Sequence, residues 1–244
     1  MIDQFSRTKL LYGQIEIESL KKYHIAVFGI GGVGGYATDS LARSGIFNFS
    51  LFDNDNVSIT NCNRQIIANM NNVGKLKVDL MKERILSINP LAKVKCYNFF
   101  VNKGNINEID FSEFDYVIDA IDTITSKVLI IKKCNELNIP IISSMGAGNK
   151  LNPMGFIVTD IYKTEVDPLA KVMRNLLRKE GIKKLKVVFS KETITKPINI
   201  LDENEESSKR EIPGSNAFVP AACGLLIGST VLNDLIRKTK NDLF

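Results

Sequence analysis

Seven short segments rich in strand-forming residues alternate along the chain with stretches in which apolar residues recur every three or four positions. Short runs with many Val, Ile and Phe predict strands, here over residues 24–29, 48–52, 93–99, 115–122, 140–143, 154–161 and 186–190. The helical spacing predicts helices over residues 35–44, 73–88, 126–137 and 167–179. We therefore expect an α/β fold: a Rossmann-like, doubly wound, mostly parallel sheet with an additional antiparallel C-terminal portion.

The same pattern predicts how the chain is organised. Residues 1–160 are expected to form the doubly wound domain with an N-terminal arm, and residues 161–244 a substrate or dimer region that continues the same sheet. The arm, residues 5–22, precedes the first strand, so we expect it to lie over another surface such as a second subunit. Residues 195–214 carry many charges without apolar periodicity, which predicts a mobile loop.

The longest apolar stretch covers residues 218–236. A membrane-spanning helix needs about 20 predominantly apolar residues, and this stretch is interrupted by Pro220, Ser229, Thr230, Asn233 and Asp234. We therefore expect a buried helix or a subunit contact, and no stable membrane insertion.

Four glycines follow the first predicted strand directly: Gly29, Gly31, Gly32 and Gly34. Glycine there permits tight turning, close approach of a phosphate to the backbone, and close packing of the next helix on the strand. The N-terminus of that helix offers free N–H groups to an anion. Asp53 ends the next strand, 19 residues after Gly34, where its carboxylate can accept hydrogen bonds from a ribose. This order predicts a nucleotide site, with NAD, FAD, S-adenosylmethionine and ATP all open.

A group of polar and charged residues further along the chain narrows the choice of nucleotide. They are Asn61, Arg64 and Gln65 in the loop after the second strand, Lys77 in the next helix, and Asp122 at a later strand end. Arg64 and Lys77 would neutralise phosphates, and Asp122 could hold Mg²⁺. Hydride transfer needs no such cationic cluster, so a nucleoside triphosphate is favoured. Asp55, in the same loop, is explained equally well as a solvated acid and as a ligand.

Composition limits the chemistry further. The chain of 244 residues has a net charge of +5, which is compatible with a polyanionic partner. Its one histidine, His24, lies next to a strand and is expected to be structural. The four cysteines form no CxxC pair, which argues against a zinc ribbon and favours reduced thiols in the cytoplasm. Cys223, between Ala222 and Gly224, is expected to be a small buried residue rather than a reactive thiol.

These motifs resemble those of adenylating enzymes of the ubiquitin-activating type, the ThiF and MoeB type. In that family a GxGGxG turn precedes an acidic strand end, an N-x-x-R-Q loop, a helix lysine and a D-x-x-D strand end, and all occur here in order between residues 24 and 125. The resemblance implies that Asp53 binds the ribose and that Asp122 is the magnesium-linked catalytic acid. It implies that the phosphates contact Asn61, Arg64 and Lys77.

The resemblance also implies the rest of the site, within an ATP-binding adenylation domain at residues 1–160. The nucleotide-binding residues would be Gly29, Gly31, Gly32, Gly34, Asp53, Asp55, Asn61, Arg64, Gln65, Lys77 and Asp122. Catalysis would involve Asp122, Arg64, Lys77 and Arg7. Arg7 lies in the arm that in this family supplies an arginine to the partner subunit's phosphate site, which implies a homodimer that is necessary for catalysis.

The second half resembles the tRNA threonylcarbamoyladenosine dehydratase branch of this family. The likeness rests on residues 146–148, 159–164, 167–174, 188–190 and 214–220, and on the missing zinc-binding cysteine pairs. Members of that branch use ATP to cyclise the threonylcarbamoyl group of a tRNA adenosine. ATP, Mg²⁺ and tRNA are thereby implied, while a monovalent cation (Na⁺ or K⁺) and a cysteine desulfurase partner stay open. Phosphate contacts to tRNA would come from the basic residues Lys171, Arg174, Arg178 and Lys179.

Other hypotheses stay open at this point. One is an adenylyltransferase that activates a ubiquitin-like sulfur-carrier protein, although such an enzyme would be expected to carry zinc cysteines. A second is an NAD-linked oxidoreductase, supported by the glycine turn alone. A third is a tRNA-binding protein that has lost activity, against which the intact set of acidic and basic site residues argues.

Overall fold

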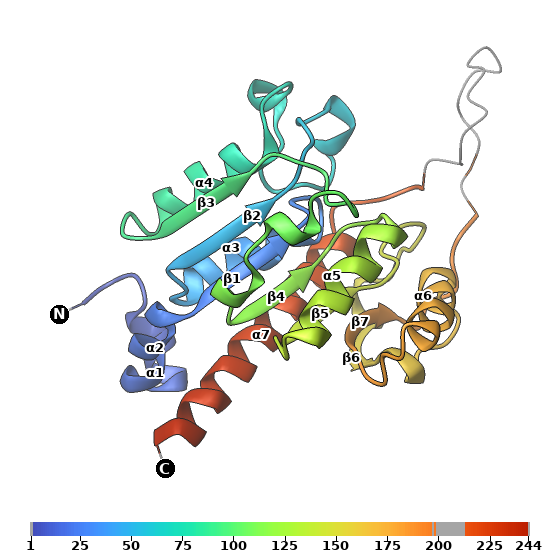
Figure 1. Cartoon of the computed structure of the whole chain (residues 1–244). Coiled ribbons are helices and arrows are strands. Elements are labelled where there is room, and N and C mark those ends of the chain that lie inside the picture. The colour runs from blue at the N-terminus through green and yellow to red at the C-terminus, as the bar shows by residue number, and fades with distance from the viewer. Residues whose placement is uncertain (1, 197, 199–212, 244) are drawn as a thin grey trace.

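The structure is a computed structural model that describes residues 2–196, 198 and 213–243. Its strands are β1 (His24–Phe28), β2 (Asn48–Phe52), β3 (Lys93–Tyr97), β4 (Tyr116–Asp119), β5 (Ile141–Ser144), β6 (Phe156–Asp160) and β7 (Lys186–Ser190). They form one sheet in the order β3-β2-β1-β4-β5-β7-β6 (Figure 1). Every neighbouring pair is parallel except β6 and β7, which are antiparallel. The predicted fold class is therefore confirmed.

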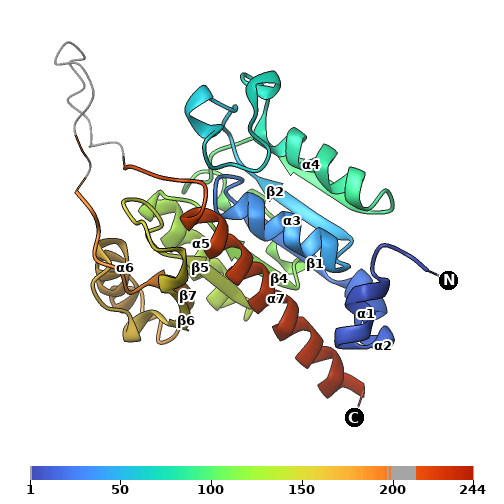
Figure 2. The same ribbon diagram turned by 180° about the vertical axis from the view of Figure 1, so that it is seen from behind.

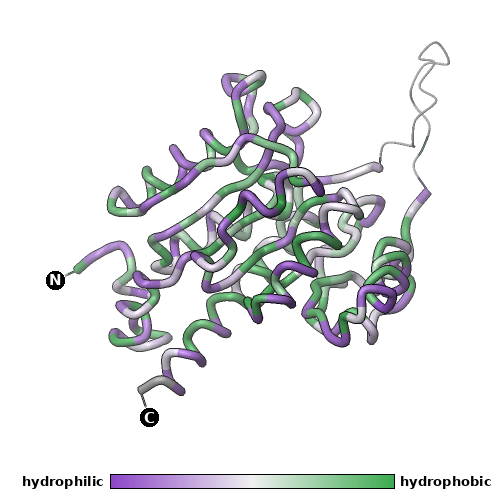
Figure 3. The backbone as a smooth tube through the Cα atoms, viewed as in Figure 1, coloured by the Kyte–Doolittle hydropathy of each residue, from purple (hydrophilic) through white to green (hydrophobic). Residues whose placement is uncertain are grey.

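Helices cover both faces of this sheet (Figures 1 and 2). They are α1 (Ser6–Tyr12), α2 (Gln14–Ser19), α3 (Gly34–Ser44), α4 (Lys77–Ile88), α5 (Ile124–Glu136), α6 (Pro168–Lys179) and α7 (Val219–Leu243). On β1, Ile25 and Val27 pack in the cluster that contains α3, α4 and α7, whereas Ala26 and Phe28 pack toward α5. Both faces of the strand are thus buried, which explains its continuous apolar sequence. Figure 3 shows hydrophobic positions along the strands and hydrophilic ones at the outer sides of the helices.

The C-terminal apolar stretch forms α7, which crosses α3 at close range (Figure 2). Two glycines permit this approach: a Cβ on Gly224 would lie 2.3 Å from the carbonyl oxygen of Val33, and one on Gly228 would lie 2.1 Å from Ser40 Oγ. Within the described residues, α7 is the one helix long and apolar enough to cross a membrane, but 56% of the window that passes this test is buried in the protein. A core helix, as predicted, explains both observations.

Some predicted boundaries are wrong. The helix predicted from residue 73 begins at Lys77, because Gly74 adopts φ +88° and Leu76 is extended. The strand predicted over residues 115–122 ends at Asp119, so Asp122 lies in the following loop. Most of the loop predicted at residues 195–214 lies outside the described residues.

Candidate active site

A cleft of about 710 Å³ opens at the carboxyl ends of β1, β2 and β4. In the sheet, β2 lies on one side of β1 and β4 lies on the other. The cleft therefore lies where the strand order reverses. Open α/β sheets bind ligands at this switch point. All the predicted nucleotide-binding residues line the cleft except Gly34: Gly29, Gly31, Gly32, Asp53, Asp55, Asn61, Arg64, Gln65, Lys77 and Asp122.

Two glycines of the turn shape the backbone. Gly29 has φ +90°, a backbone conformation that residues with a side chain rarely adopt. A Cβ there would lie 2.8 Å from the carbonyl oxygen of Ala120. A Cβ on Gly34 would lie 1.8 Å from the carbonyl oxygen of Gly29. Gly34 therefore allows α3 to pack on the end of β1.

Asp53 anchors the glycine turn to the end of β2. Its Oδ2 accepts a hydrogen bond of 2.6 Å from the backbone N–H of Ile30, and its Oδ1 accepts one of 2.9 Å from the N–H of Asp55. Burial raises the pKa of the Asp53 carboxyl above its usual value, and the Lys77 ammonium lowers that pKa in part. The carboxylate is thus held in a defined position in the cleft that lies beside the turn.

Lys77, the first residue of α4, brings a buried positive charge into the cleft. Its Nζ lies 2.6 Å from Asp55 Oδ2 and 3.9 Å from Asp53 Oδ1, and its side chain is 7% exposed. The Asp55 side chain is 59% exposed. Asp55 is therefore a counterion for Lys77. An anionic ligand could replace the Asp55 carboxylate as the partner of the Lys77 ammonium.

The loop after β2 supplies amide and guanidinium groups. Asn61 Oδ1 accepts from the N–H of Ser58 at 3.1 Å, which closes a turn of 3-10 helix. Arg64 Nη1 donates to the carbonyl oxygen of Thr60 at 2.8 Å and to Asn63 Oδ1 at 3.0 Å. The Oε1 atom of buried Gln65 has no hydrogen-bond partner in the described part of the chain. A buried acceptor without a partner is costly, so a ligand that donates a hydrogen bond fits this position.

Asp122 lies in the loop between β4 and α5 with its side chain exposed to the cleft. Its Oδ1 accepts a bond of 3.3 Å from Thr123 Oγ1, and Thr123 is the N-cap residue of α5, although its side chain makes no capping hydrogen bond. Among the described residues there is no cluster of three or more His, Cys, Asp or Glu side chains. Mg²⁺ commonly binds one or two carboxylates together with substrate phosphates and water, so Asp122 fits as a single protein ligand.

Arg7 does not line the cleft of its own chain. It is an exposed residue of α1, which lies with α2 beside the C-terminal half of α7 (Figures 1 and 2). Hydrogen bonds that join the hydroxyls of Ser19 and Tyr23 with that of Thr239 hold this region on α7. Within one chain Arg7 therefore cannot take part in the site.

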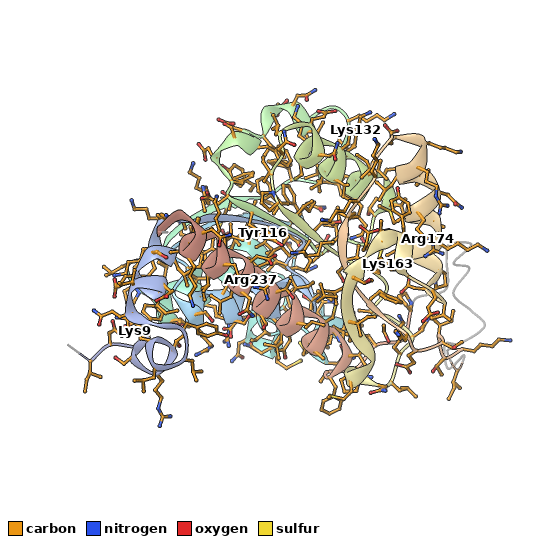
Figure 4. All side chains as sticks on the ribbon, turned by 90° about the horizontal axis from the view of Figure 1, so that it is seen from below. Lys9, Tyr116, Lys132, Lys163, Arg174 and Arg237 are labelled. Carbon is orange, nitrogen blue, oxygen red and sulfur yellow. The ribbon has the colours of Figure 1, made fainter. Side chains whose placement is uncertain are left out.

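The predicted tRNA-binding residues on α6 differ in their surroundings; Figure 4 labels one of them, Arg174. Arg174 donates to the carbonyl oxygen and the hydroxyl of Thr164, and the Arg178 guanidinium lies 5.2 Å from the ring centroid of Tyr162. Lys171 and Lys179 are exposed. The two lysines are thus the more available cations, and both arginines help to hold the helix.

Two buried groups lie directly beneath the cleft: Asp119, the first acid of the D-x-x-D strand end, and Lys127, which the sequence analysis did not single out. The side chains of Lys127 and Asp119 are both 0% exposed and form an ion pair of 3.0 Å. One sequence signal could have identified Lys127: it is a lysine among apolar residues on the inward side of the helix predicted over residues 126–137.

Cys223 is fully buried, as predicted. Burial raises the pKa of its thiol to about 12, and a hydrogen bond with Ser144 offsets this only in part. Because the thiolate is the reactive form, we expect iodoacetamide at neutral pH to modify half-buried Cys62 in the native protein and to leave Cys223 unmodified. Peptide mass spectrometry measures both. Alkylation of Cys223 as fast as that of Cys62 would contradict this placement and reopen a role as a sulfur carrier.

The chain is similar to proteins of known activity along nearly its whole length. The sequence model of the ThiF family matches residues 5–242. A tRNA threonylcarbamoyladenosine dehydratase of Bacillus subtilis is 46% identical over 97% of this chain and 96% of that protein. The enzyme of the same name from Escherichia coli is 40% identical over 80% of this chain and 75% of its own length. The crystal structure of E. coli tRNA N6-threonylcarbamoyladenosine dehydratase, TcdA, in complex with ATP matches with a TM-score of 0.88 at 35% identity, covering 98% of this chain and 96% of that one.

Proposed function

The chain belongs to the ThiF family, and we propose that it is an ATP-dependent tRNA threonylcarbamoyladenosine dehydratase. The observation that carries the proposal is the single cleft in which the glycine turn, Arg64, Lys77 and Asp122 meet. The similarity to enzymes of this name over nearly the full length supports it. A sulfur-carrier adenylyltransferase would be expected to carry zinc-binding cysteine pairs, and the four cysteines form no CxxC pair.

The reaction overcomes the low electrophilicity of a carboxylate. The threonyl carboxylate of the modified adenosine attacks the α-phosphorus of the substrate ATP, and pyrophosphate leaves. The neighbouring carbamoyl group then attacks the activated acyl carbon within the same molecule and loses a proton, and AMP leaves with one former carboxylate oxygen. Ring closure benefits from proximity, since effective molarities of well-oriented groups reach ~10⁵ M or more. No nucleophile from the enzyme is required.

The residues of the cleft divide this work by their chemistry. Asp53 would accept hydrogen bonds from the ribose, and the N–H groups at the start of α3 would face phosphate. Arg64 and Lys77, with Asn61, would neutralise and orient the phosphates. Asp122 would hold Mg²⁺, which supplies positive charge where negative charge develops. We also propose that a monovalent cation, Na⁺ or K⁺, binds near residues 143–148.

A tRNA substrate also indicates which surface binds RNA and in which compartment the protein acts. The tRNA backbone would contact the basic residues of α6, most directly Lys171 and Lys179, because cations position phosphates without reading sequence. We place the protein in the cytoplasm, where tRNA is modified, and a cysteine desulfurase stays a candidate partner.

Nucleoside analysis of tRNA tests the proposed function. Loss of the gene from its host should remove cyclic threonylcarbamoyladenosine and leave the open form, and the wild-type gene should restore the ring while Asp122→Asn should not. Persistence of the cyclic nucleoside at its wild-type level, in a strain without a second copy of the gene, would refute the assignment.

A homodimer with shared sites is proposed from the position of Arg7, which cannot reach the cleft of its own chain. Arg7→Ala should reduce turnover about a hundredfold, and heterodimers of Arg7→Ala with Asp122→Ala chains should recover up to half of the wild-type turnover per site, because one of the two clefts is then complete. Differently tagged chains allow the heterodimer to be isolated. No recovery in verified heterodimers would contradict sharing.

A further inference from the structure

Beneath the cleft, a fully enclosed polar network joins β4, β5 and α5. Lys127 Nζ donates to Asp119 Oδ1 at 3.0 Å and to the carbonyl oxygen of Ile121 at 2.9 Å. Asp119 Oδ2 accepts a bond of 2.6 Å from Ser143 Oγ, which lies on β5. Both charged side chains are 0% exposed.

Stability alone does not account for this ion pair. Removing two charges from water carries a desolvation penalty that their attraction often fails to offset. A protein with apolar residues of similar size in place of such a pair is frequently as stable. The network also differs from an ordinary internal pair, because one of its bonds ends on the backbone of a cleft loop. Residues Ala120, Ile121, Asp122 and Thr123 of that loop all line the cleft.

The bond to Ile121 sets the orientation of one peptide unit. Because a trans peptide is planar, with its carbonyl and N–H pointing in opposite directions, a carbonyl of Ile121 turned inward to Lys127 turns the N–H of Asp122 outward. The N–H of Ile121 also points inward, toward Asp119 Oδ1 at 3.4 Å. In the described part of the chain, no backbone acceptor pairs with the N–H of Asp122.

We propose that Lys127 is a positioning residue, whose buried ammonium holds the Ile121–Asp122 peptide so that both the N–H and the carboxylate of Asp122 face the reacting phosphate. The proposal rests on the proposed function of the cleft. Lys127 itself touches no substrate. Its effect belongs in the chemical step rather than in ATP affinity, because the anchors of the nucleotide, Asp53 and Lys77, lie on other elements.

The double variant Lys127→Met/Asp119→Asn tests this. It removes both charges together, so no buried charge is left unpaired, but it also removes the donor to Ile121. We expect a folded protein in which kcat falls about a hundredfold, the loss that small misplacements in an active site produce, while the KM for ATP changes less than threefold. The matched control is Lys186→Met/Asp234→Asn, an ion pair between β7 and α7 outside the cleft, which should keep the wild-type kcat.

Amide hydrogen exchange supplies a readout that does not depend on activity. Exchange at the amide of Ile121, which donates to Asp119, should be faster in the Lys127→Met/Asp119→Asn protein than in the wild type, and unchanged in the control. A folded double variant with wild-type kcat, or with unchanged exchange at the Ile121 amide, overturns the proposal. A wild-type protein without dehydratase activity would refute the proposed function, and exchange would still decide the positioning role. If the double variant does not fold, Ser143→Ala must show the same changes in smaller measure, and unchanged kcat and exchange there overturn the proposal too.

Discussion

Asp122→Asn is expected to lower kcat about a thousandfold while the protein folds and still binds ATP. The side chain is exposed and its one side-chain contact is a 3.3 Å bond from Thr123, so the fold does not depend on it. The amide is isosteric but has no charge to hold Mg²⁺, and losing electrostatic stabilisation of a transition state costs about 10²–10³ in rate for a single group. Steady-state kinetics with threonylcarbamoyladenosine-containing tRNA measures the change.

Glu108→Gln is the matched control for this variant. Glu108 is exposed and lies outside the cleft, so its replacement removes the same charge from the protein without touching the site. The control should retain wild-type kcat. Equal activity of the Asp122→Asn and Glu108→Gln proteins would remove Asp122 from the mechanism.

Lys77→Met is expected to reduce kcat/KM for ATP by about two to three orders of magnitude. The ammonium is almost fully buried beside Asp53 and Asp55, so its loss leaves two carboxylates facing a polyanionic ligand with no compensating charge at this position. Because Lys77 would contact phosphates in both the ground state and the transition state, KM should rise as kcat falls. Titration of ATP binding by calorimetry separates the two effects.

The neighbouring lysine provides the comparison. Lys75 is exposed, and its side chain makes one hydrogen bond, of 3.4 Å, to Asn72 Oδ1. Lys75→Met should therefore leave both kcat and KM near their wild-type values. If the two lysine variants behave alike, the buried ammonium has no special part in the binding of ATP.

The nucleotide-binding half was largely predictable because its signals are local. The glycines after β1, the acid at the end of β2 and the apolar strands each report on their immediate neighbours in the chain, and the structure brings them to one cleft. The position of β7 between β5 and β6 was not predictable, because strand order depends on long-range packing of α6 and α7 against the sheet.

The polar partnerships within the site also escaped prediction. Neither the pairing of Lys77 with Asp55 across 22 positions nor that of Lys127 with Asp119 follows from sequence spacing alone. Close packing of the helix on the strand was expected from the glycines, but the atom that fills the space of a side chain at Gly34, the carbonyl oxygen of Gly29, was not. Such features depend on how elements meet in space, and only coordinates show them.

The central claim is that the cleft uses a triphosphate to make a carboxylate reactive, and the fate of one oxygen atom tests it most directly. The purified protein would be incubated with ATP, Mg²⁺ and tRNA whose threonylcarbamoyladenosine carries a heavy oxygen isotope in both oxygens of the carboxylate. Mass spectrometry of the products should find one labelled oxygen in the phosphate of AMP for each ring formed. Cyclic product formed with unlabelled AMP, or without consumption of ATP, would contradict the account.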